Sequence, residues 1–153
     1  MSERTSIVAA HQFLRKMPAA HAERMAALAT HVTFPARQMI FEEGTPARKF
    51  WLIDAGQAEL EARVPGNGRV IIEELGRGDL LGLSWLQPPY QWQYGAIATQ
   101  PVQAFEFEAA AVREAMAADP EFGFELMTRL MAVAAHRLNA TRARLLQARV
   151  GVS

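Results

Sequence analysis

The stretch FEEGTPARKFWLIDAG, residues 41–56, indicates the fold more strongly than any other part of the chain. Two acidic residues and a turn that contains glycine and proline precede a run of large apolar and aromatic side chains, and a second glycine follows the run. Short apolar runs bounded by glycine and proline are typical of buried β-strands. We therefore expect a strand over Phe50–Asp54 with a turn on each side.

Similar short runs continue through the middle of the chain, and glycines interrupt them at regular intervals. Many short strands separated by turn residues are typical of sandwiches, barrels and jelly rolls. The sequence PGNG at residues 65–68 predicts a hairpin tip, because Gly and Asn tolerate positive φ. The strands that we expect are His31–Phe34, Gln38–Phe41, Phe50–Asp54, Ala58–Val64, Arg69–Leu75, Gly95–Ala98 and Val102–Phe107.

Helical patterns flank this β-rich region. Residues 6–30 carry large apolar residues at helical spacing, and Pro18 divides them into two short helices. After the strands, the pattern predicts a helix over Glu108–Ala118, a break at Asp119-Pro120, and a long helix over Glu121–Ala148. We therefore expect one domain over residues 1–153, with N-terminal helices in 6–30, a β-region in 31–107 and C-terminal helices in 108–149.

The long C-terminal helix carries two apolar stripes. One follows the alternating steps of three and four residues that are typical of a coiled-coil seam: Met127, Met131, Ala134, Leu138, Thr141 and Leu145. The other lies on a neighbouring face and consists of Leu126, Leu130 and Val133. Because a helix of this length extends beyond a small domain, we expect one stripe to pack on the domain and the seam to form a homodimer. The alternative is that both stripes belong to the core.

Composition excludes several classes of function. Half of the 153 residues are hydrophobic, and 16 Lys and Arg balance 16 Asp and Glu. That balance argues against long-range attraction to nucleic acid or to an anionic membrane. The absence of Cys excludes disulfides, thiolate catalysis and Cys-ligated zinc. The four His lack metal-ligand spacing, and no Ser, His and acid pattern is present, so we expect neither a metal site nor an enzyme.

The N-terminus also limits the expected location of the protein. Its apolar run, Ile7–Ala10, is too short for a signal peptide or a membrane span. We therefore expect a cytoplasmic protein with no membrane partner.

Three stretches of the chain, taken in order, resemble the cyclic nucleotide-binding domain of the CRP/FNR superfamily. Residues 41–56 resemble the opening of that domain, and GRGDLLG at residues 76–82 resembles the approach to its phosphate-binding cassette. Asp119-Pro120 before a long helix also matches the family layout. The resemblance covers nearly the whole chain. It implies a mainly β fold with flanking helices: a β-roll (a double-stranded β-helix or jelly roll) with N-terminal helices and a long C-terminal helix.

The family is regulatory, and the resemblance implies a β-roll built around a ligand pocket, which a base-facing group from the long helix completes. Relatives continue into a winged-helix domain, whereas this sequence stops at Ser153, so we expect no direct DNA binding. The expected ligand-binding residues of the cassette are Gly82, Leu83, Ser84, Trp85, Tyr94, Gly95 and Ala96. On the long helix, Thr141 matches the base-contacting threonine of the family, and Arg142 next to it is the cation that we expect to reach an anion in the pocket.

Two residues that the family uses to hold a cyclic nucleotide are replaced here. Leu83 stands at the position of the ribose-binding Glu, and Gln93 and Tyr94 stand where the phosphate-binding Arg is expected. A hydrogen bond to a charged group contributes about 1.5–3 kcal/mol. Without both anchors, we expect binding of cyclic AMP to weaken by about a hundredfold or more, and cyclic AMP or cyclic GMP not to be held in the usual way.

The cassette is instead rich in aromatic residues, namely Trp85, Tyr90, Trp92 and Tyr94. One interpretation is a pocket rebuilt for another planar ligand, which stacking would hold, in a ligand-sensing regulatory module. The other is that the rings fill the nucleotide site and leave a ligand-free dimeric scaffold or protein-interaction module. Exposed tryptophans favour the first interpretation, and buried tryptophans favour the second.

Overall fold

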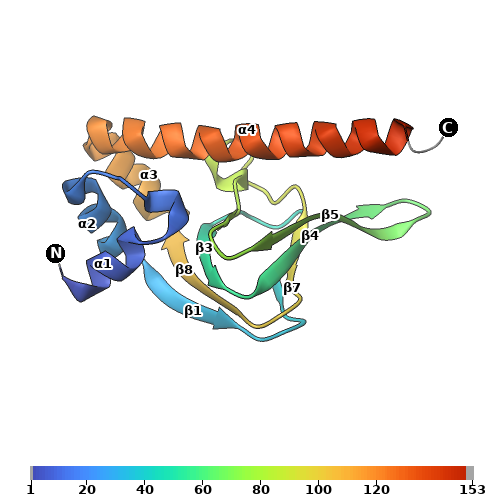
Figure 1. Ribbon diagram of the computed structural model, residues 1–153, viewed down its shortest axis with the longest axis horizontal. Coiled ribbons are helices and arrows are strands. Elements are labelled where there is room, and N and C mark those ends of the chain that lie inside the picture. Colours follow the sequence, from blue (N-terminus) through green and yellow to red (C-terminus); the bar gives the residue numbers. More distant parts are fainter. Residues whose placement is uncertain (1, 151–153) are drawn as a thin grey trace.

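The computed structural model describes residues 2–150 as two antiparallel sheets, with α1, α2 and α3 at one end of them and the long α4 along one face (Figure 1). The first sheet has the strand order β1-β8-β3-β6, and the second has the order β2-β7-β4-β5. The strands are β1 (Thr30–Phe34), β2 (Met39–Phe41), β3 (Lys49–Ala55), β4 (Gln57–Val64), β5 (Gly68–Gly76), β6 (Leu80–Leu81), β7 (Gly95–Ala98) and β8 (Val102–Glu108). The helices are α1 (Glu3–Ala9), α2 (Ala19–Leu28), α3 (Ala109–Ala118) and α4 (Pro120–Val150), with short 3₁₀ helices η1 (Gln12–Leu14) and η2 (Ser84–Leu86).

The predicted strands are all present, with ends that differ by at most one residue. The pattern of apolar residues does not predict β6, because two residues are too few to give a periodic signal, but the resemblance of residues 76–82 to the turn and strand before the cassette does place a strand there. The turn after β3 depends on a glycine: Gly56 has φ +91°, and a Cβ there would lie 1.9 Å from the carbonyl oxygen of Pro101. Any side chain at this position would separate β3 from the start of β8.

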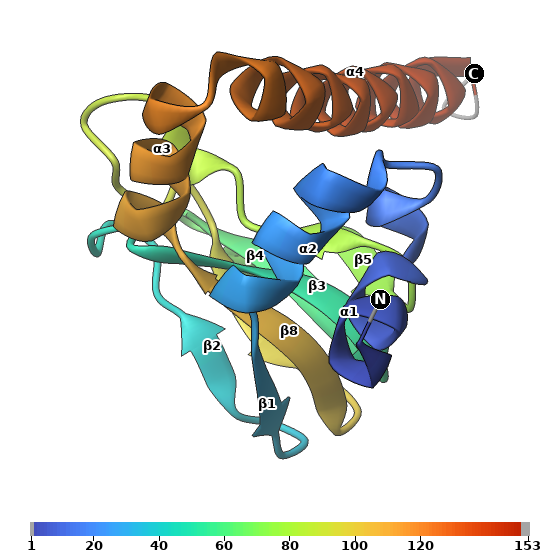
Figure 2. The ribbon, with the colours of Figure 1, turned by 90° about the vertical axis from the view of Figure 1, so that its left-hand side faces the viewer.

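The N-terminal region contains two short helices on either side of Pro18, as predicted, but α1 begins at Glu3, before the predicted range, and ends at Ala9, with η1 between it and α2. Figure 2 shows α1 and α2 beside the sheet that contains β1, β8 and β3. His11 connects η1 to that sheet. Its Nε2 donates to the carbonyl oxygen of Ile53 at 2.8 Å, and its Nδ1 accepts from the backbone N–H of Phe13 at 3.1 Å. Burial lowers the pKa of His11, so the imidazole is held in its neutral form.

The break between α3 and α4 lies where the sequence predicts it. Asp119 Oδ1 accepts from the N–H of Phe122 at 3.3 Å, and Pro120 occupies the first position of α4. The stripe formed by Leu126 and Leu130 is buried against the domain, as expected. Within residues 2–150, no helix combines the length and apolar character that crossing a bilayer requires.

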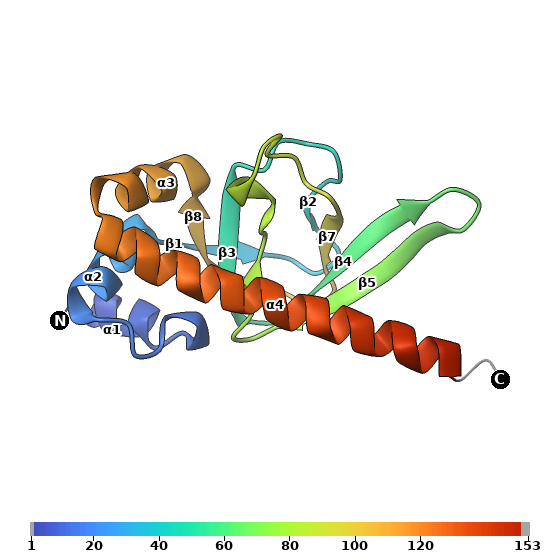
Figure 3. The same cartoon turned by 90° about the horizontal axis from the view of Figure 1, so that it is seen from above.

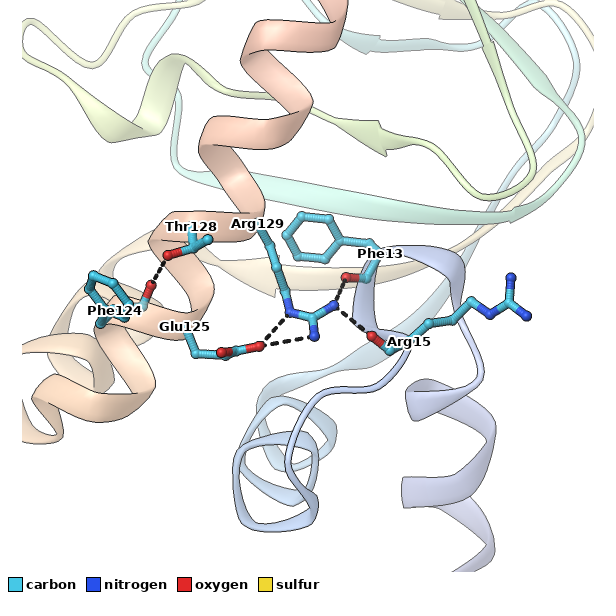
Figure 4. A network of polar contacts seen from close by, with 6 residues as sticks. All are labelled: Phe13, Arg15, Phe124, Glu125, Thr128 and Arg129. Carbon is cyan, nitrogen blue, oxygen red and sulfur yellow. Dashed lines mark hydrogen bonds and ion pairs between the residues drawn. The ribbon is translucent and has the colours of Figure 1, made fainter.

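Three arginines of α4 donate hydrogen bonds to other parts of the domain at successive positions along the helix. Arg129 pairs with Glu125 and donates to the carbonyl oxygens of Phe13 and Arg15, each at 2.8 Å (Figure 4). Farther along, Arg137 donates to the carbonyl oxygen of Leu80 and lies 3.8 Å from Glu73. Burial lowers the pKa of Arg137, while Glu73 and Asp79 act in the opposite direction. Arg144 donates to the carbonyl oxygen of Ile72 at 2.6 Å. Contacts with η1, β5 and β6 therefore determine the position of α4 on the domain.

Candidate functional site

The site that the sequence predicts lies in the segment between β6 and β7, which we call the aromatic loop (residues 83–94). Backbone hydrogen bonds hold this loop against the turn that follows β2. The N–H of Trp92 donates to the carbonyl oxygen of Thr45, and the N–H of Gly44 donates to that of Trp92, both at 2.9 Å. The N–H of Ala47 donates to the carbonyl oxygen of Tyr90 at 2.7 Å. The backbone thus positions Trp92 at the end of the β-roll.

The indole of Trp92 is buried between residues of both sheets, with 5% of the residue exposed. It stacks on Phe41 of β2 with a centroid distance of 3.7 Å, and its centroid lies 6.1 Å from that of Trp51 in β3. A Cβ at Gly82 would lie 2.9 Å from Cη2 of this indole, and Gly82 has φ +105°. The glycine that begins the predicted cassette therefore makes room for the Trp92 ring.

The second tryptophan of the loop is completely buried. Trp85 stacks on Phe50 with a centroid distance of 4.5 Å, and its Nε1 donates to the carbonyl oxygen of Gly82 at 3.0 Å. Phe50 in turn stacks on Phe107 of β8. Trp85 and Trp92 thus belong to two stacks that continue into the core of the β-roll.

Arg113 of α3 is a residue of this site that the sequence analysis missed. Its Nη1 donates to the carbonyl oxygen of Trp85 at 2.7 Å, and its guanidinium lies 4.8 Å from the centroid of the Tyr90 ring. The contact joins residues that are 28 positions apart in the chain. Nothing in the local sequence pattern around Arg113 indicates it.

Gly95 and Ala96, which end the predicted cassette, lie in β7 between β2 and β4. Within the loop, Ser84 Oγ lies 3.4 Å from the N–H of Gln93, which donates to it. Leu83 is half-buried, and Tyr94 is exposed. Of the cassette residues, the structure thus brings Gly82 directly against Trp92 and joins Ser84 to the neighbouring Gln93.

The two predicted ligand residues from the long helix lie elsewhere. Thr141 and Arg142 are exposed on the C-terminal half of α4, and Thr141 Oγ1 accepts from Arg144 at 3.4 Å. Across residues 2–150, no hydrogen bond, ion pair or ring contact of the structure joins these two side chains to the aromatic loop. The structure does not bring them to the cassette.

A cavity of about 220 Å³ opens beside Gly95. Glu42, Glu43 and Glu61 line it, together with Arg63, whose backbone N–H donates to Glu43 Oε1 at 3.3 Å. Glu61 also pairs with Arg69, its Oε1 lying 3.4 Å from Nη1. Carboxylates still outnumber the cations around this cavity, which disfavours an anionic ligand there. Within residues 2–150, His, Asp and Glu form no group that could hold a metal ion.

Comparisons with known proteins agree with this architecture. A family model described as the cyclic nucleotide-binding domain matches residues 31–119. One similar solved structure is a candidate cyclic nucleotide-binding protein from Geobacter metallireducens GS-15, with 24% identity and a TM-score of 0.77, covering 90% of this chain and 99% of that chain. Another is a cyclic nucleotide-binding domain from Methylobacillus flagellatus KT, with 19% identity and a TM-score of 0.81, covering 94% and 81%.

The c-di-GMP responsive global regulator CLP from Xanthomonas campestris is a more distant example, with 14% identity and a TM-score of 0.74 over 85% of this chain and 64% of that chain. No curated protein sequence matches the chain. At these identities the solved structures establish the fold alone. The predicted β-roll with flanking helices is confirmed.

Proposed function

We propose that this chain, which belongs to the cyclic nucleotide-binding domain family, is a regulatory module whose nucleotide site is closed by its own aromatic loop. The observation that carries the proposal is the position of Trp92. Its ring stacks on Phe41 and packs against Gly82, the first residue of the cassette. A ligand that enters between these residues has to displace the ring first.

The cost of that displacement is large compared with ordinary binding energies. A buried aromatic side chain removes about 150–250 Å² from water, and each Å² contributes about 25 cal/mol. Exposing the Trp92 ring therefore costs about 4–6 kcal/mol, which lowers the apparent affinity of a competing ligand by about 10³–10⁴-fold. The missing phosphate-binding Arg and the carboxylates near Gly95 add to this penalty. Cyclic AMP is thus poorly matched to the site.

In this proposal the output of the module is a homodimer formed through α4, in the cytoplasm and without catalytic activity. The seam of α4 faces solvent, whereas the neighbouring stripe is buried against the domain. An apolar stripe left uncovered along a helix is typical of a surface that pairs with another helix. The module then acts as a scaffold with a fixed conformation.

One observation favours a second candidate, a sensor for a different planar ligand. Tyr90 and Tyr94 of the aromatic loop are exposed, and Arg113 lies against the ring of Tyr90. If the loop opens, these residues present two aromatic faces and one cation to a ligand. This candidate requires a mobile loop, which distinguishes it from the closed scaffold.

Isothermal titration of the purified protein with cyclic AMP and then cyclic GMP tests the proposal, supported by thermal-shift measurements. A ligand at a hundred times its Kd adds about 2.7 kcal/mol of stability, which a thermal shift detects readily. We expect no heat and no shift with either nucleotide. Binding of cyclic AMP with a Kd below about 10 µM would refute the closed site.

Acrylamide quenching of tryptophan fluorescence separates the two candidates. The chain has three Trp, and all of them are buried, so a closed scaffold predicts weak quenching. Replacing Tyr94 by Trp provides a matched exposed control on the same loop. Strong quenching of the unmodified protein would favour the sensor.

A further inference from the structure

His11 is the one histidine of this chain that the fold buries. The sequence has four histidines, all within the described residues 2–150, and only His11 lies among the buried residues, with 6% of the residue exposed. It is the N-cap of η1. Because an imidazole exchanges an acceptor for a donor when it binds a proton, the contacts of this buried ring depend on pH.

Both ring nitrogens of His11 are in use, and their partners require the neutral form. The carbonyl oxygen of Ile53, 2.8 Å from Nε2, can only accept, so Nε2 carries the hydrogen. The backbone N–H of Phe13, 3.1 Å from Nδ1, can only donate, so Nδ1 carries none. A second proton on the ring would go to Nδ1 and point at the N–H of Phe13. Two donors would then face each other, and η1 would lose its cap.

The same ring joins η1 to the end of β3 and to the turn before β6. The carbonyl oxygen of Ile53 accepts from the N–H of Gly78 at 3.0 Å as well as from His11. A Cβ at Gly78 would lie 2.5 Å from Oε1 of Gln12, so η1 packs closely on this turn. Loss of the His11 contacts therefore loosens the packing of η1 on the sheet.

The surroundings of His11 act on its protonation in both directions. Burial lowers the pKa of the ring, whereas Asp54 of β3 and Asp79 of the turn before β6 favour the imidazolium. Asp79 also acts on Arg137 of α4, and Arg129 of α4 is the cation nearest in the hydrogen-bond network that leads from η1. The ring is therefore neutral at pH 7 and binds a proton in mild acid.

The position of α4 depends on η1. Nη1 of Arg129 donates to the carbonyl oxygens of Phe13 and Arg15, each at 2.8 Å (Figure 4). Phe13 thus links two contacts, since its N–H binds His11 and its carbonyl oxygen binds Arg129. Figure 3 shows the first half of α4, residues 120–134, next to the N-terminal segment, and its C-terminal part extending past the β-roll. Displacement of η1 therefore reaches the first half of α4.

We propose that His11 is an acid-sensitive latch: protonation of its ring releases η1 from the sheet and, through Phe13, loosens the first half of α4. The second half stays in place, because Arg137 and Arg144 bind carbonyl oxygens of β6 and β5 and not of η1. At neutral pH the latch is closed and α4 keeps one position. This inference does not depend on whether the aromatic loop is closed.

An NMR titration of the full-length protein between pH 8 and 4.5 tests the latch. Long-range ¹H–¹⁵N spectra give the tautomer and the protonation state of the His11 ring. We expect an Nε2–H tautomer at pH 8, a pKa below 6.5, and a shift of the Phe13 amide signal with the same midpoint. Hydrogen-exchange protection factors of residues 120–134 should fall by about tenfold or more, as expected when hydrogen bonds to a charged group are lost. Those of residues 137–146 should change little.

Three substitutions separate the latch from general effects of acid. Oδ1 of an Asn can replace Nδ1 as the cap but does not titrate, so His11→Asn should remove the response of α4 to pH. Arg129→Gln should keep the titration of His11 and the shift of Phe13 but remove the response of α4. His136→Gln is the matched control, because His136 is an exposed histidine of α4, and its replacement should leave both midpoints unchanged.

Four results would overturn the proposal. One is a His11 ring that stays neutral at pH 4.5. Another is titration of His11 without any change in α4, which would break the coupling through Phe13. A response of α4 that persists in His11→Asn would assign the effect to carboxylates such as Asp79. Loss of the far-UV circular dichroism with the same midpoint would show that the whole domain unfolds in acid.

Discussion

Replacing Trp92 by Ala is the most direct perturbation of the closed site. The ring is buried, stacks on Phe41 at 3.7 Å and contacts Gly82, so its removal leaves a cavity lined by apolar groups. Substitution of a buried Trp by Ala costs about 3–5 kcal/mol. For a domain of this size each kcal/mol lowers Tm by about 2–4 °C, so we expect a decrease of roughly 6–20 °C.

Urea unfolding followed by far-UV circular dichroism measures this loss, and indole tests its cause. An apolar cavity of this kind binds small aromatic molecules, so millimolar indole should raise the stability of the variant and leave the unmodified protein unchanged. Tyr94→Ala is the control on the same loop; because Tyr94 is exposed, its replacement should change the free energy of unfolding by less than about 0.5 kcal/mol. A loss below about 1 kcal/mol for Trp92→Ala would refute the argument that this ring closes the roll.

Three further predictions follow from single contacts. Burial lowers the pKa of His11 below its ordinary value of 6.5, so the unfolded chain binds the proton more tightly than the native protein does. The contribution of His11 to the free energy of unfolding is therefore fully present above pH 6.5 and should decrease as the pH falls toward the native pKa. In urea titrations between pH 8 and 5, His11→Gln should flatten this dependence. Gly56→Ala should abolish folding or lower Tm strongly, because its Cβ would overlap the carbonyl of Pro101; a Tm within about 2 °C of the original would contradict the packing of this turn. Leu130 is buried, so Leu130→Ala should lower the free energy of unfolding by about 2–5 kcal/mol. Leu138 is exposed, so Leu138→Ala should leave the monomer nearly as stable and weaken only the dimer. Equal losses of unfolding free energy for the two variants in dilute solution would show that both stripes belong to the core.

Sequence patterns were sufficient for the elements of the fold, because each long element has a clear period or a clear terminator. Asp119-Pro120 begins α4 through the side-chain cap of Asp119 on the N–H of Phe122 and through a proline that favours the first turn of a helix, and both effects are local. The strand β6 and the 3₁₀ helix η1 give no periodic signal, because they have only two or three residues. Tertiary contacts, not local preferences, produce these short elements.

The candidate site was predicted less completely, because its residues also meet through tertiary contacts and not through local sequence preferences. The sequence identified the cassette and its aromatic residues, yet nothing local reveals that Trp92 stacks on Phe41, which lies about fifty residues earlier. Arg113 was missed because its partner, the carbonyl of Trp85, belongs to another element. Thr141 was assigned from the family layout and Arg142 as the cation beside it, and both side chains are exposed on α4 although Arg144, two residues after Arg142, binds the carbonyl oxygen of Ile72.

The contacts that hold α4 on the domain bear on the proposal that this module keeps one conformation. Arg137 and Arg144 bind the carbonyl oxygens of Leu80 and Ile72, and Leu80 lies two residues before Gly82. A change at the cassette would therefore reach α4 through a few backbone atoms of β6. Trp92 packs directly on Gly82, the residue that follows β6. If the site is closed as proposed, the Trp92 ring stands in for a ligand next to β6, and the conformation of α4 is then expected to stay the same whatever the concentration of a cyclic nucleotide.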